Sequence, residues 1–155
     1  MKFKNPMLVV ADIEASKAFY KDVLGLRTIA DFGANVTLSG GVALQTLESW
    51  CSFTGLQPED VHFAHNTMEL YFEEDDFDTF AKKLSALPGI RYLHDVTTAP
   101  WGQRAVRFYD LDGHIIEVGE DMKAVCKRFA ATGLSVEEIA AEMQVPVGYV
   151  QRQLK

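Results

Sequence analysis

The spacing of apolar residues along the chain alternates between that of a β-strand and that of an α-helix, and this pattern occurs twice. Residues 3–10 are mostly apolar and extended in character, whereas residues 13–24 place apolar side chains at helical spacing. Asp12 is a suitable N-cap for this helix and Gly25 a suitable C-terminal stop. A second strand and amphipathic helix follow at residues 67–87, with Asp76 as the N-cap of the helix. The pattern predicts two related half-domains, each with a crossover helix between strands.

Gly and Asp-Gly turns separate eight predicted strands. These strands are residues 3–10, 26–32, 36–38, 42–47, 67–72, 91–96, 105–109 and 114–118. Together with the two helices they predict an α+β domain over residues 1–120, with modules at about 3–48 and 66–120.

The repeat superposes four polar residues. When the first half is laid on the second, Asn5 falls on Glu69. The hairpins match independently and lay Gln45 on Glu117. A carboxylate within an apolar strand is unfavourable unless it is paired, hydrated or bound to a metal. We therefore expect Asn5, Gln45, Glu69 and Glu117 to face one cleft.

Strand alternation predicts which other residues share that cleft. If Tyr109 pairs with His114 across the turn, Val106 lies opposite Glu117. Arg104 and Phe108 then lie on the same face as Val106, because side chains alternate with a period of two.

Three segments resemble a known family. They are residues 9–26 (VVADIEASKAFYKDVLGL), 100–104 (PWGQR) and 108–118 (FYDLDGHIIEV). They are similar to the vicinal-oxygen-chelate superfamily, the glyoxalase/bleomycin-resistance/extradiol-dioxygenase proteins. The resemblance covers about residues 3–120. It implies paired βαβββ modules whose curled mixed sheets surround a shared cleft, and it implies a homodimer.

The resemblance also implies a site for one divalent metal ion (Mg, Mn, Ni or Zn), with Asn5, Gln45, Glu69 and Glu117 as ligands. Oxygen donors of this kind suit hard cations. The chain has no His at these positions, unlike the metal-binding members, which disfavours extradiol dioxygenase and fosfomycin-resistance activity. A metal-free polar floor to the cleft is the alternative. With a metal, Glu117 would be the general base and Glu69 its symmetric counterpart.

Aromatic and other side chains near the predicted cleft are candidates for substrate binding. They are Met7, Trp50, Tyr71, Trp101, Arg104 and Phe108. Trp50 and Trp101 could equally close the core. Of the four histidines, only His65 shares the parity of Glu69, and we interpret the histidines as surface or turn residues.

Composition narrows the classes of function. The net charge of −7 argues against a general preference for nucleic acid. No apolar run approaches the roughly 20 residues of a membrane helix, and the N-terminus does not resemble a secretory signal. These features predict a cytoplasmic protein with no membrane partner. Cys51 and Cys126 form no recognisable motif and are expected to be free thiols.

Residues 121–155 are predicted to form a helical extension that resembles a small helix-turn-helix. Ser135 and Glu138 form a capping box, and Pro146 begins the last helix. Basic and acidic residues balance in this segment, so DNA binding is disfavoured. Its apolar stripe predicts a role in packing or dimer contact.

The leading hypothesis is a small-molecule-binding protein of the glyoxalase/bleomycin-resistance type. If it is an enzyme, the resemblance implies a metal-assisted lyase or isomerase similar to glyoxalase I. The alternative is a non-catalytic protein that sequesters a ligand or drug. A ligand-responsive regulator that uses the C-terminal helices on DNA is a weaker alternative.

Overall fold

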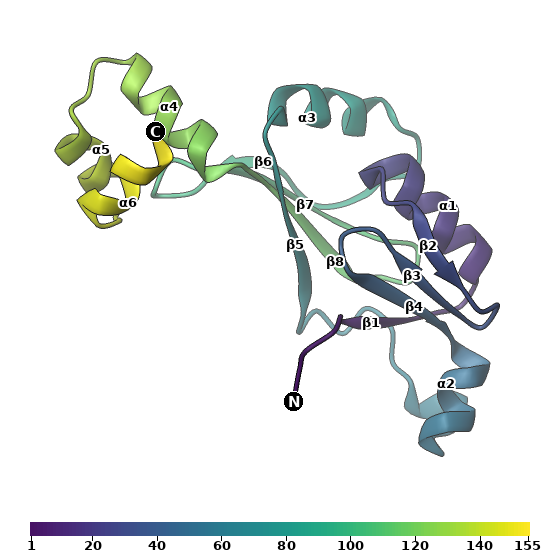
Figure 1. Cartoon of the computed structure of the whole chain (residues 1–155). Helices are drawn as coiled ribbons and strands as arrows, with labels where there is room; N and C mark the ends of the chain where they lie inside the picture. The colour runs from purple at the N-terminus through teal and green to yellow at the C-terminus, as the bar shows by residue number, and fades with distance from the viewer. The chain divides into compact units, whose positions relative to one another are not determined.

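A computed structural model describes all 155 residues and confirms the α+β fold with two βαβββ modules (Figure 1). The first module contains β1 (Met7–Val10), α1 (Ile13–Leu24), β2 (Thr28–Asp31), β3 (Asn35–Leu38) and β4 (Val42–Thr46). The second contains β5 (Glu69–Glu74), α3 (Phe77–Ala86), β6 (Arg91–Thr98), β7 (Arg104–Tyr109) and β8 (Ile115–Glu120). Helix α2 (Leu47–Thr54) and the 3₁₀ turn η1 (Pro58–Asp60) connect the modules, and α4 (Met122–Ala131), α5 (Val136–Glu142) and α6 (Val147–Gln153) follow them. None of the six α-helices has both the length and the apolar character needed to cross a lipid bilayer.

The chain divides into two compact units. Unit 1 comprises residues 1–68 and 109–114, and unit 2 comprises residues 69–108 and 115–155. The turn between β7 and β8 therefore belongs to unit 1. Each unit buries apolar side chains of its own, among them Leu8 and Leu44 in unit 1 and Leu84 and Ile116 in unit 2.

The two sheets have the same topology. Their strand orders are β1-β4-β3-β2 and β5-β8-β7-β6, so the first strand of each module pairs with the last. Both of these pairs are parallel, with Val9 beside Gln45 in one sheet and Tyr71 beside Glu117 in the other. The crossover from the first strand through a helix permits this parallel pairing.

Helices α1 and α3 are positioned by the caps that the sequence predicts. The Asp12 carboxylate accepts a hydrogen bond from the Ala15 N–H at 3.0 Å, and Asp76 does the same for Thr79 at 3.2 Å. Gly25 ends α1 with a φ of 71°, a conformation that glycine adopts without strain. Helix α1 buries Tyr20 and Val23, and α3 buries Phe77, Phe80 and Leu84.

Two predicted elements differ from the structure for clear physical reasons. The first strand was expected at residues 3–10 but begins at Met7, because Pro6 has no N–H with which to extend the ladder. No helix is predicted between the two modules, but the segment after β4 forms α2. Thr46 caps this helix through Ser49, and Gly55 ends it in the left-handed conformation.

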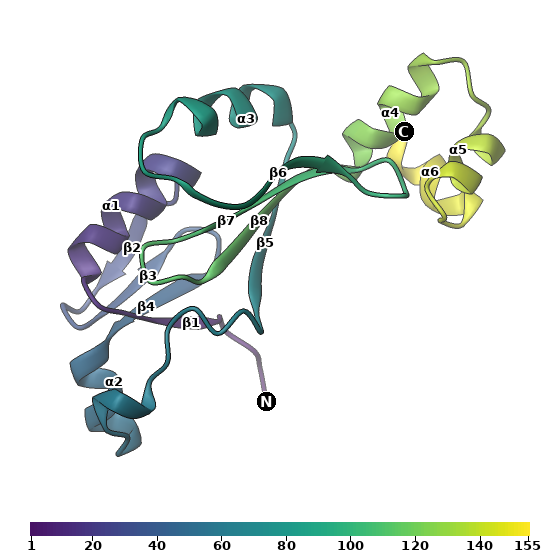
Figure 2. The same cartoon turned by 180° about the vertical axis from the view of Figure 1, so that it is seen from behind.

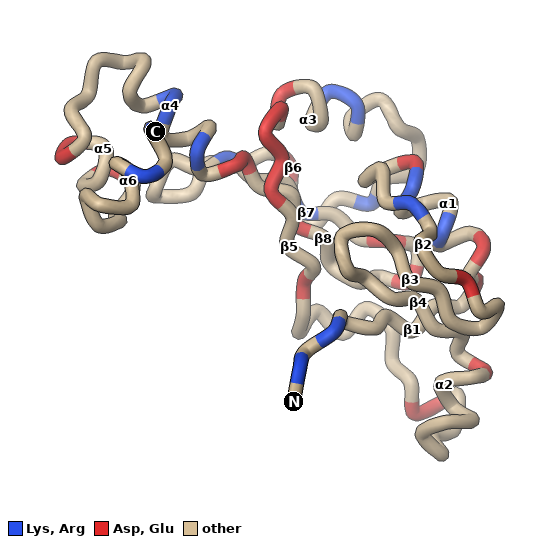
Figure 3. Tube along the Cα trace, viewed as in Figure 1, with Lys and Arg blue, Asp and Glu red and all other residues tan.

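The C-terminal helices α4, α5 and α6 pack on one another rather than leaving an apolar stripe uncovered (Figures 1 and 2). Their shared core contains Val125, Cys126, Ile139, Ala140, Met143 and Val150, all buried. The apolar stripe is thus covered within the three helices themselves, and a role of the segment in dimer contact stays a prediction. Both charge signs occur on these helices (Figure 3), as the balanced composition predicts.

Helix α4 is attached to the sheet of unit 2 by a buried carboxylate. Glu120 is 3% exposed and accepts hydrogen bonds from Arg104 Nε at 3.1 Å and Arg128 Nη2 at 2.9 Å. Burial would raise the pKa of Glu120, but the two guanidinium groups hold it below its ordinary value. Arg128 also donates to the carbonyl oxygen of Gly102. The start of β7, the end of β8 and helix α4 are therefore joined through the paired Glu120 carboxylate.

At Gly102 the backbone closely approaches the Phe129 ring of α4, and this contact allows the attachment to be tested. A Cβ atom at Gly102 would fall on the Phe129 ring, whereas a Cβ at Gly133 would meet nothing within 4 Å. Both glycines have positive φ, 83° and 90°. Gly133→Ala should therefore lower the free energy of unfolding by only about 1–2 kcal/mol, the cost of a left-handed backbone for a residue with a Cβ. Gly102→Ala should lose about 1–3 kcal/mol more, because the ring must move.

Urea unfolding of the two variants beside the wild type measures this difference. Equal losses of stability would mean that Phe129 is not packed on Gly102.

Candidate functional site

The two predicted carboxylates lie on one face of the sheet in unit 2. Glu69 is the first residue of β5, and Glu117 lies on β8. In the parallel register Glu69 pairs with Ile115 and Tyr71 pairs with Glu117, so all four side chains share a face. Residue Glu117 is 7% exposed, whereas Glu69 is at an accessible strand end.

Arg107 from β7 connects the two carboxylates. Its Nε donates to Glu69 Oε2 at 2.9 Å, and its Nη2 donates to Glu117 Oε2. The remaining Nη1 lies 3.3 Å from His94 Nε2 on β6. One guanidinium group thus joins side chains from all four strands of this sheet.

In this arrangement the pKa values of the two carboxylates are shifted in opposite directions. The hydrogen bond from Arg107 lowers the pKa of Glu69 below its ordinary value. Burial, together with the nearby Glu69, raises the pKa of Glu117. Glu117 is therefore the carboxyl that more readily carries a proton, and the pair with Arg107 keeps a net charge of about −1 when both are ionised.

The residues do not fit a resident metal ion in this arrangement. A divalent cation needs free oxygen donors, but Arg107 already engages both Glu69 and Glu117. The amide of Gln45 is also engaged, since its oxygen accepts from Asn35 at 2.7 Å and its nitrogen donates to Ser49. Asn5 precedes β1 and donates to the Pro6 carbonyl oxygen at 3.2 Å. Each of the four expected ligands therefore has a protein partner.

Arg104 and Phe108 lie on the other face of the sheet, so their placement beside Glu117 is wrong. Arg104 donates to Asp78 of α3 at 2.7 Å and lies over the Phe77 ring at 5.1 Å, and Phe108 is fully buried. The predicted hairpin register is displaced by one residue, which moves every side chain of β7 to the opposite face. Arg107, rather than Val106, is the neighbour of Glu117.

Tyr71 and Trp101 are brought together by Gln103. The Gln103 amide donates to the Tyr71 hydroxyl at 2.8 Å, and its oxygen accepts from Trp101 Nε1 at 3.1 Å. The Tyr71 hydroxyl in turn donates to Glu73 at 2.8 Å. Partial burial raises the pKa of Tyr71 to about 12, so this phenol stays protonated at neutral pH.

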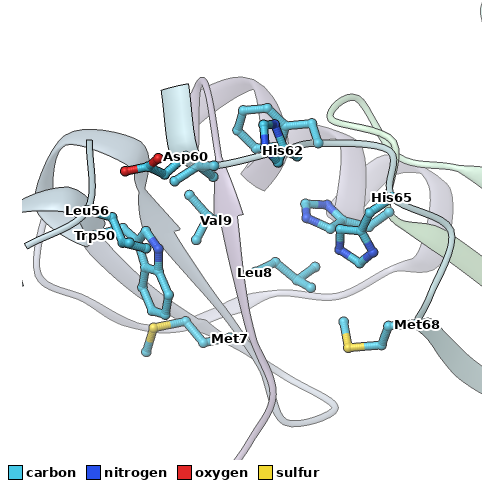
Figure 4. A pocket seen from close by; sticks show the side chains of 12 residues that line it. Met7, Leu8, Val9, Trp50, Leu56, Asp60, His62, His65 and Met68 are labelled. Carbon is cyan, nitrogen blue, oxygen red and sulfur yellow. The ribbon is translucent and has the colours of Figure 1, made fainter. Parts of the chain in front are cut away.

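Met7 and Trp50 lie elsewhere, at a cavity of about 350 Å³ in unit 1 (Figure 4). Figure 4 shows the Trp50 ring beside Met7 at one end, with His65 and Met68 at the other. The full lining comprises Met7, Leu8, Val9, Trp50, Leu56, Asp60, Val61, His62, Phe63, His65, Met68 and His114. Three of the four histidines of the chain therefore border one cavity.

The sequence interpretation missed Arg107, His94, Gln103 and the histidines of the cavity. Arg107 could have been found, because a charged residue inside the apolar strand 105–109 requires a partner. No local pattern could place His62, His65 and His114 together, because the segment after α2 supplies the first two and the turn between β7 and β8 supplies the third. Whether the two polar pairs of the modules share one cleft stays a prediction.

Comparisons with known proteins agree with this fold. The sequence matches the model of the glyoxalase-like domain family over residues 3–123. Comparison with curated proteins gave no match. A solved protein of unknown function from Agrobacterium tumefaciens str. C58 is 38% identical, with a TM-score of 0.69, and the match covers 78% of this chain and 94% of that one.

Two more distant structures support the fold alone. A glyoxalase/bleomycin resistance protein/dioxygenase from Nocardioides is 23% identical with a TM-score of 0.63, covering 77% of this chain and 83% of that one. A glyoxalase-related enzyme from Fulvimarina pelagi is 20% identical with a TM-score of 0.65, covering 79% and 90%. The family match ends within α4, so α5 and α6 lie outside it.

Removing Arg107 should expose the dependence of the fold on this charge. In Arg107→Gln, two carboxylates remain close without a cation. We expect a loss of about 1–3 kcal/mol at pH 7, between the values for exposed and buried pairs. The pKa of Glu69 is lowered in the folded protein, so the ionised side chain stabilises the fold at pH values above its ordinary pKa. This contribution is lost as the pH falls through the pKa of the folded state. The pKa of Glu117 is raised, so its contribution to stability is present at pH values below its ordinary pKa. That contribution is lost as the pH rises through the pKa of the folded state.

The deficit of Arg107→Gln should therefore shrink as the pH falls towards 4, where protonation relieves the repulsion. Urea unfolding between pH 4 and pH 7 measures it. Lys17→Gln is the control, because Lys17 makes exposed ion pairs with Glu14 and Asp31 and should matter little. A deficit that does not change with pH would contradict the assignment.

Metal titration tests the fit of the carboxylate pair directly. Calorimetric titration of Mn²⁺, Ni²⁺ and Zn²⁺ should give the same heats for the wild type and Glu117→Gln, because Arg107 holds both carboxylates. Saturable heat in the wild type that is lost in Glu117→Gln would restore Glu117 as a metal ligand.

Proposed function

Because the chain belongs to the glyoxalase-like domain family, we propose that it is a small-molecule-binding protein of the glyoxalase/bleomycin-resistance type that holds an apolar or aromatic ligand without a metal ion. The observation that carries this proposal is the cavity of unit 1. Its volume of about 350 Å³ lies in the range of small-molecule sites and is lined mainly by aromatic, aliphatic and thioether groups.

The lining also indicates the charge of the ligand. Asp60 is the one acidic residue that borders the cavity, and no Lys or Arg does so. A carboxylate without a neighbouring cation disfavours an anionic ligand. Trp50 offers an aromatic face for stacking, while Met7 and Met68 adapt to irregular shapes. A neutral or weakly cationic aromatic molecule fits this chemistry best.

Sequestration is favoured over metal-assisted lyase or isomerase chemistry by the state of the carboxylate pair. Lewis-acid catalysis would need Glu69 and Glu117 as free ligands, and both are bonded to Arg107. The pair instead forms a compensated polar surface on the sheet of unit 2. Binding is thus the function that the side chains of unit 1 support without any rearrangement of unit 2.

A neutral fluorescent probe tests the cavity. N-phenyl-1-naphthylamine should bind the wild type saturably with enhanced fluorescence, because it matches the apolar lining. Trp50→Ala should weaken its affinity by about tenfold or more, since a lost aromatic contact is worth at least about 1.4 kcal/mol.

Trp101→Ala is the matched control, because Trp101 bonds to Gln103 in unit 2 and does not border the cavity. The control should bind the probe as the wild type does. Absence of saturable binding by the wild type, or equal weakening in both variants, would overturn the proposal.

A further inference from the structure

His114 is held at the wall of the cavity by a buried carboxylate. Its Nδ1 lies 2.8 Å from Asp110 Oδ2, and its backbone N–H donates to Asp110 Oδ1 at 2.8 Å. Asp110 is 5% exposed and also accepts from the Tyr20 hydroxyl at 2.8 Å. Both the orientation and the partner of the imidazole are therefore set by the interior of unit 1.

The carboxylate decides which nitrogen of His114 carries the proton. Burial alone would raise the pKa of Asp110, but the bonds from His114 and Tyr20 hold it below its ordinary value. An ionised carboxylate only accepts hydrogen bonds, so His114 Nδ1 must be the donor. In the neutral imidazole, Nε2 is then left with a free lone pair that can take a proton.

The second ring nitrogen of His114, Nε2, is unengaged. It makes no hydrogen bond within the protein, and no fully buried polar side-chain atom lacks a partner, so Nε2 keeps access to open space. The cavity is bordered by His114, whose side chain is 10% exposed. Phe63 lies edge-on to the ring with centroids 6.4 Å apart.

His65, on the same cavity, has the opposite tautomer. Its Nδ1 lies 3.3 Å from the Thr67 backbone N–H, which can only donate, and 2.6 Å from the Thr67 hydroxyl, which can donate as well. In the neutral ring Nε2 must therefore carry the proton. The cavity is bordered by one imidazole with a free basic nitrogen and another that can donate a hydrogen bond.

We propose that this cavity catalyses proton transfer, with His114 Nε2 as general base and His65 Nε2–H as hydrogen-bond donor to the developing anion. The inference rests on the proposed function, because it uses the same cavity. The substrate class is a neutral aromatic or apolar molecule with an acidic C–H bond next to an electron-withdrawing group. Asp110 is a positioning residue that also stabilises the imidazolium formed when His114 takes the proton.

The neutral probe 5-nitrobenzisoxazole tests this chemistry in one step. His114 Nε2 takes the C3 proton, the C–H electron pair completes a C≡N triple bond, and the N–O bond breaks to release a coloured phenolate. The imidazolium then returns its proton to water, so the protein is regenerated and no other reactant is needed. Turnover by the wild type should be saturable and should rise with pH through a single deprotonation.

His114→Asn should lower kcat by about 100-fold or more, in keeping with the contribution of a general base. Asn is chosen because its amide can still donate to Asp110 while it offers no basic nitrogen. His94→Asn is the matched control, since His94 lies beside Arg107 in unit 2 and should leave kcat within about twofold. His65→Asn should also reduce kcat, by about 100-fold, the lower end of the range for loss of one donor to a developing anion.

Parallel binding of N-phenyl-1-naphthylamine separates this inference from the function beneath it. Retained probe binding with lost turnover in His114→Asn supports the assignment. Probe binding by the wild type without turnover above that of free imidazole would overturn the proton transfer but leave the binding function. Absence of probe binding would remove the binding function itself.

If His114→Asn does not fold, the pH profile of the wild type and the His62→Asn and His65→Asn variants decide the matter. A rate that is independent of pH, or one abolished by His62→Asn alone, would overturn the role of His114.

Discussion

The buried carboxylate of Asp110 is the constraint on which much of this structure depends. It accepts hydrogen bonds from the backbone N–H groups of Asp112 and His114 and from the side chains of Tyr20 and His114. The first two shape the turn between β7 and β8, and the others join that turn to α1 and orient an imidazole. A buried carboxylate is tolerated only with such complete pairing.

The turn between β7 and β8 also sets the register of the hairpin. The Asp110 N–H donates to the His114 carbonyl oxygen at 3.0 Å, and from there the strands run so that Arg107 meets Glu117. Val106 and Phe108 flank Arg107 along β7 and therefore point to the opposite face, where they are buried in the apolar core of unit 2. One local turn thus determines which side chains of β7 are polar neighbours of Glu117 and which are core.

The two modules share a topology but differ in the chemistry of their equivalent positions. In the first module, Gln45 lies in a neutral network with Asn35 and Ser49. In the second, Glu117 lies in an ionic network with Arg107 and Glu69. The neutral network satisfies its amide locally, whereas the ionic one holds a carboxyl with a raised pKa. The repeat therefore preserves the backbone and allows each half its own electrostatics.

The sequence by itself determined the α+β class, the two modules, the caps at Asp12 and Asp76 and the common face of Glu69 and Glu117. These features depend on local periodicity, on side-chain capping within a few residues and on the internal repeat. The start of β1 was predicted too early, although the local reason is present in the sequence, since Pro6 cannot donate to a ladder. Only the tertiary structure decided the hairpin register, because a shift of one residue exchanges the two faces of a strand while leaving the sequence pattern equally satisfied.

The partners of the polar groups likewise came from the tertiary structure. Tyr20 and Asp110 are 90 positions apart and meet only after the chain has folded. Arg107 engages Glu69 from a third strand, and the segment after α2 and the turn between β7 and β8 together supply three histidines to one cavity. Such contacts depend on the packing of distant elements, on which neither hydrophobic period nor charge pattern carries information.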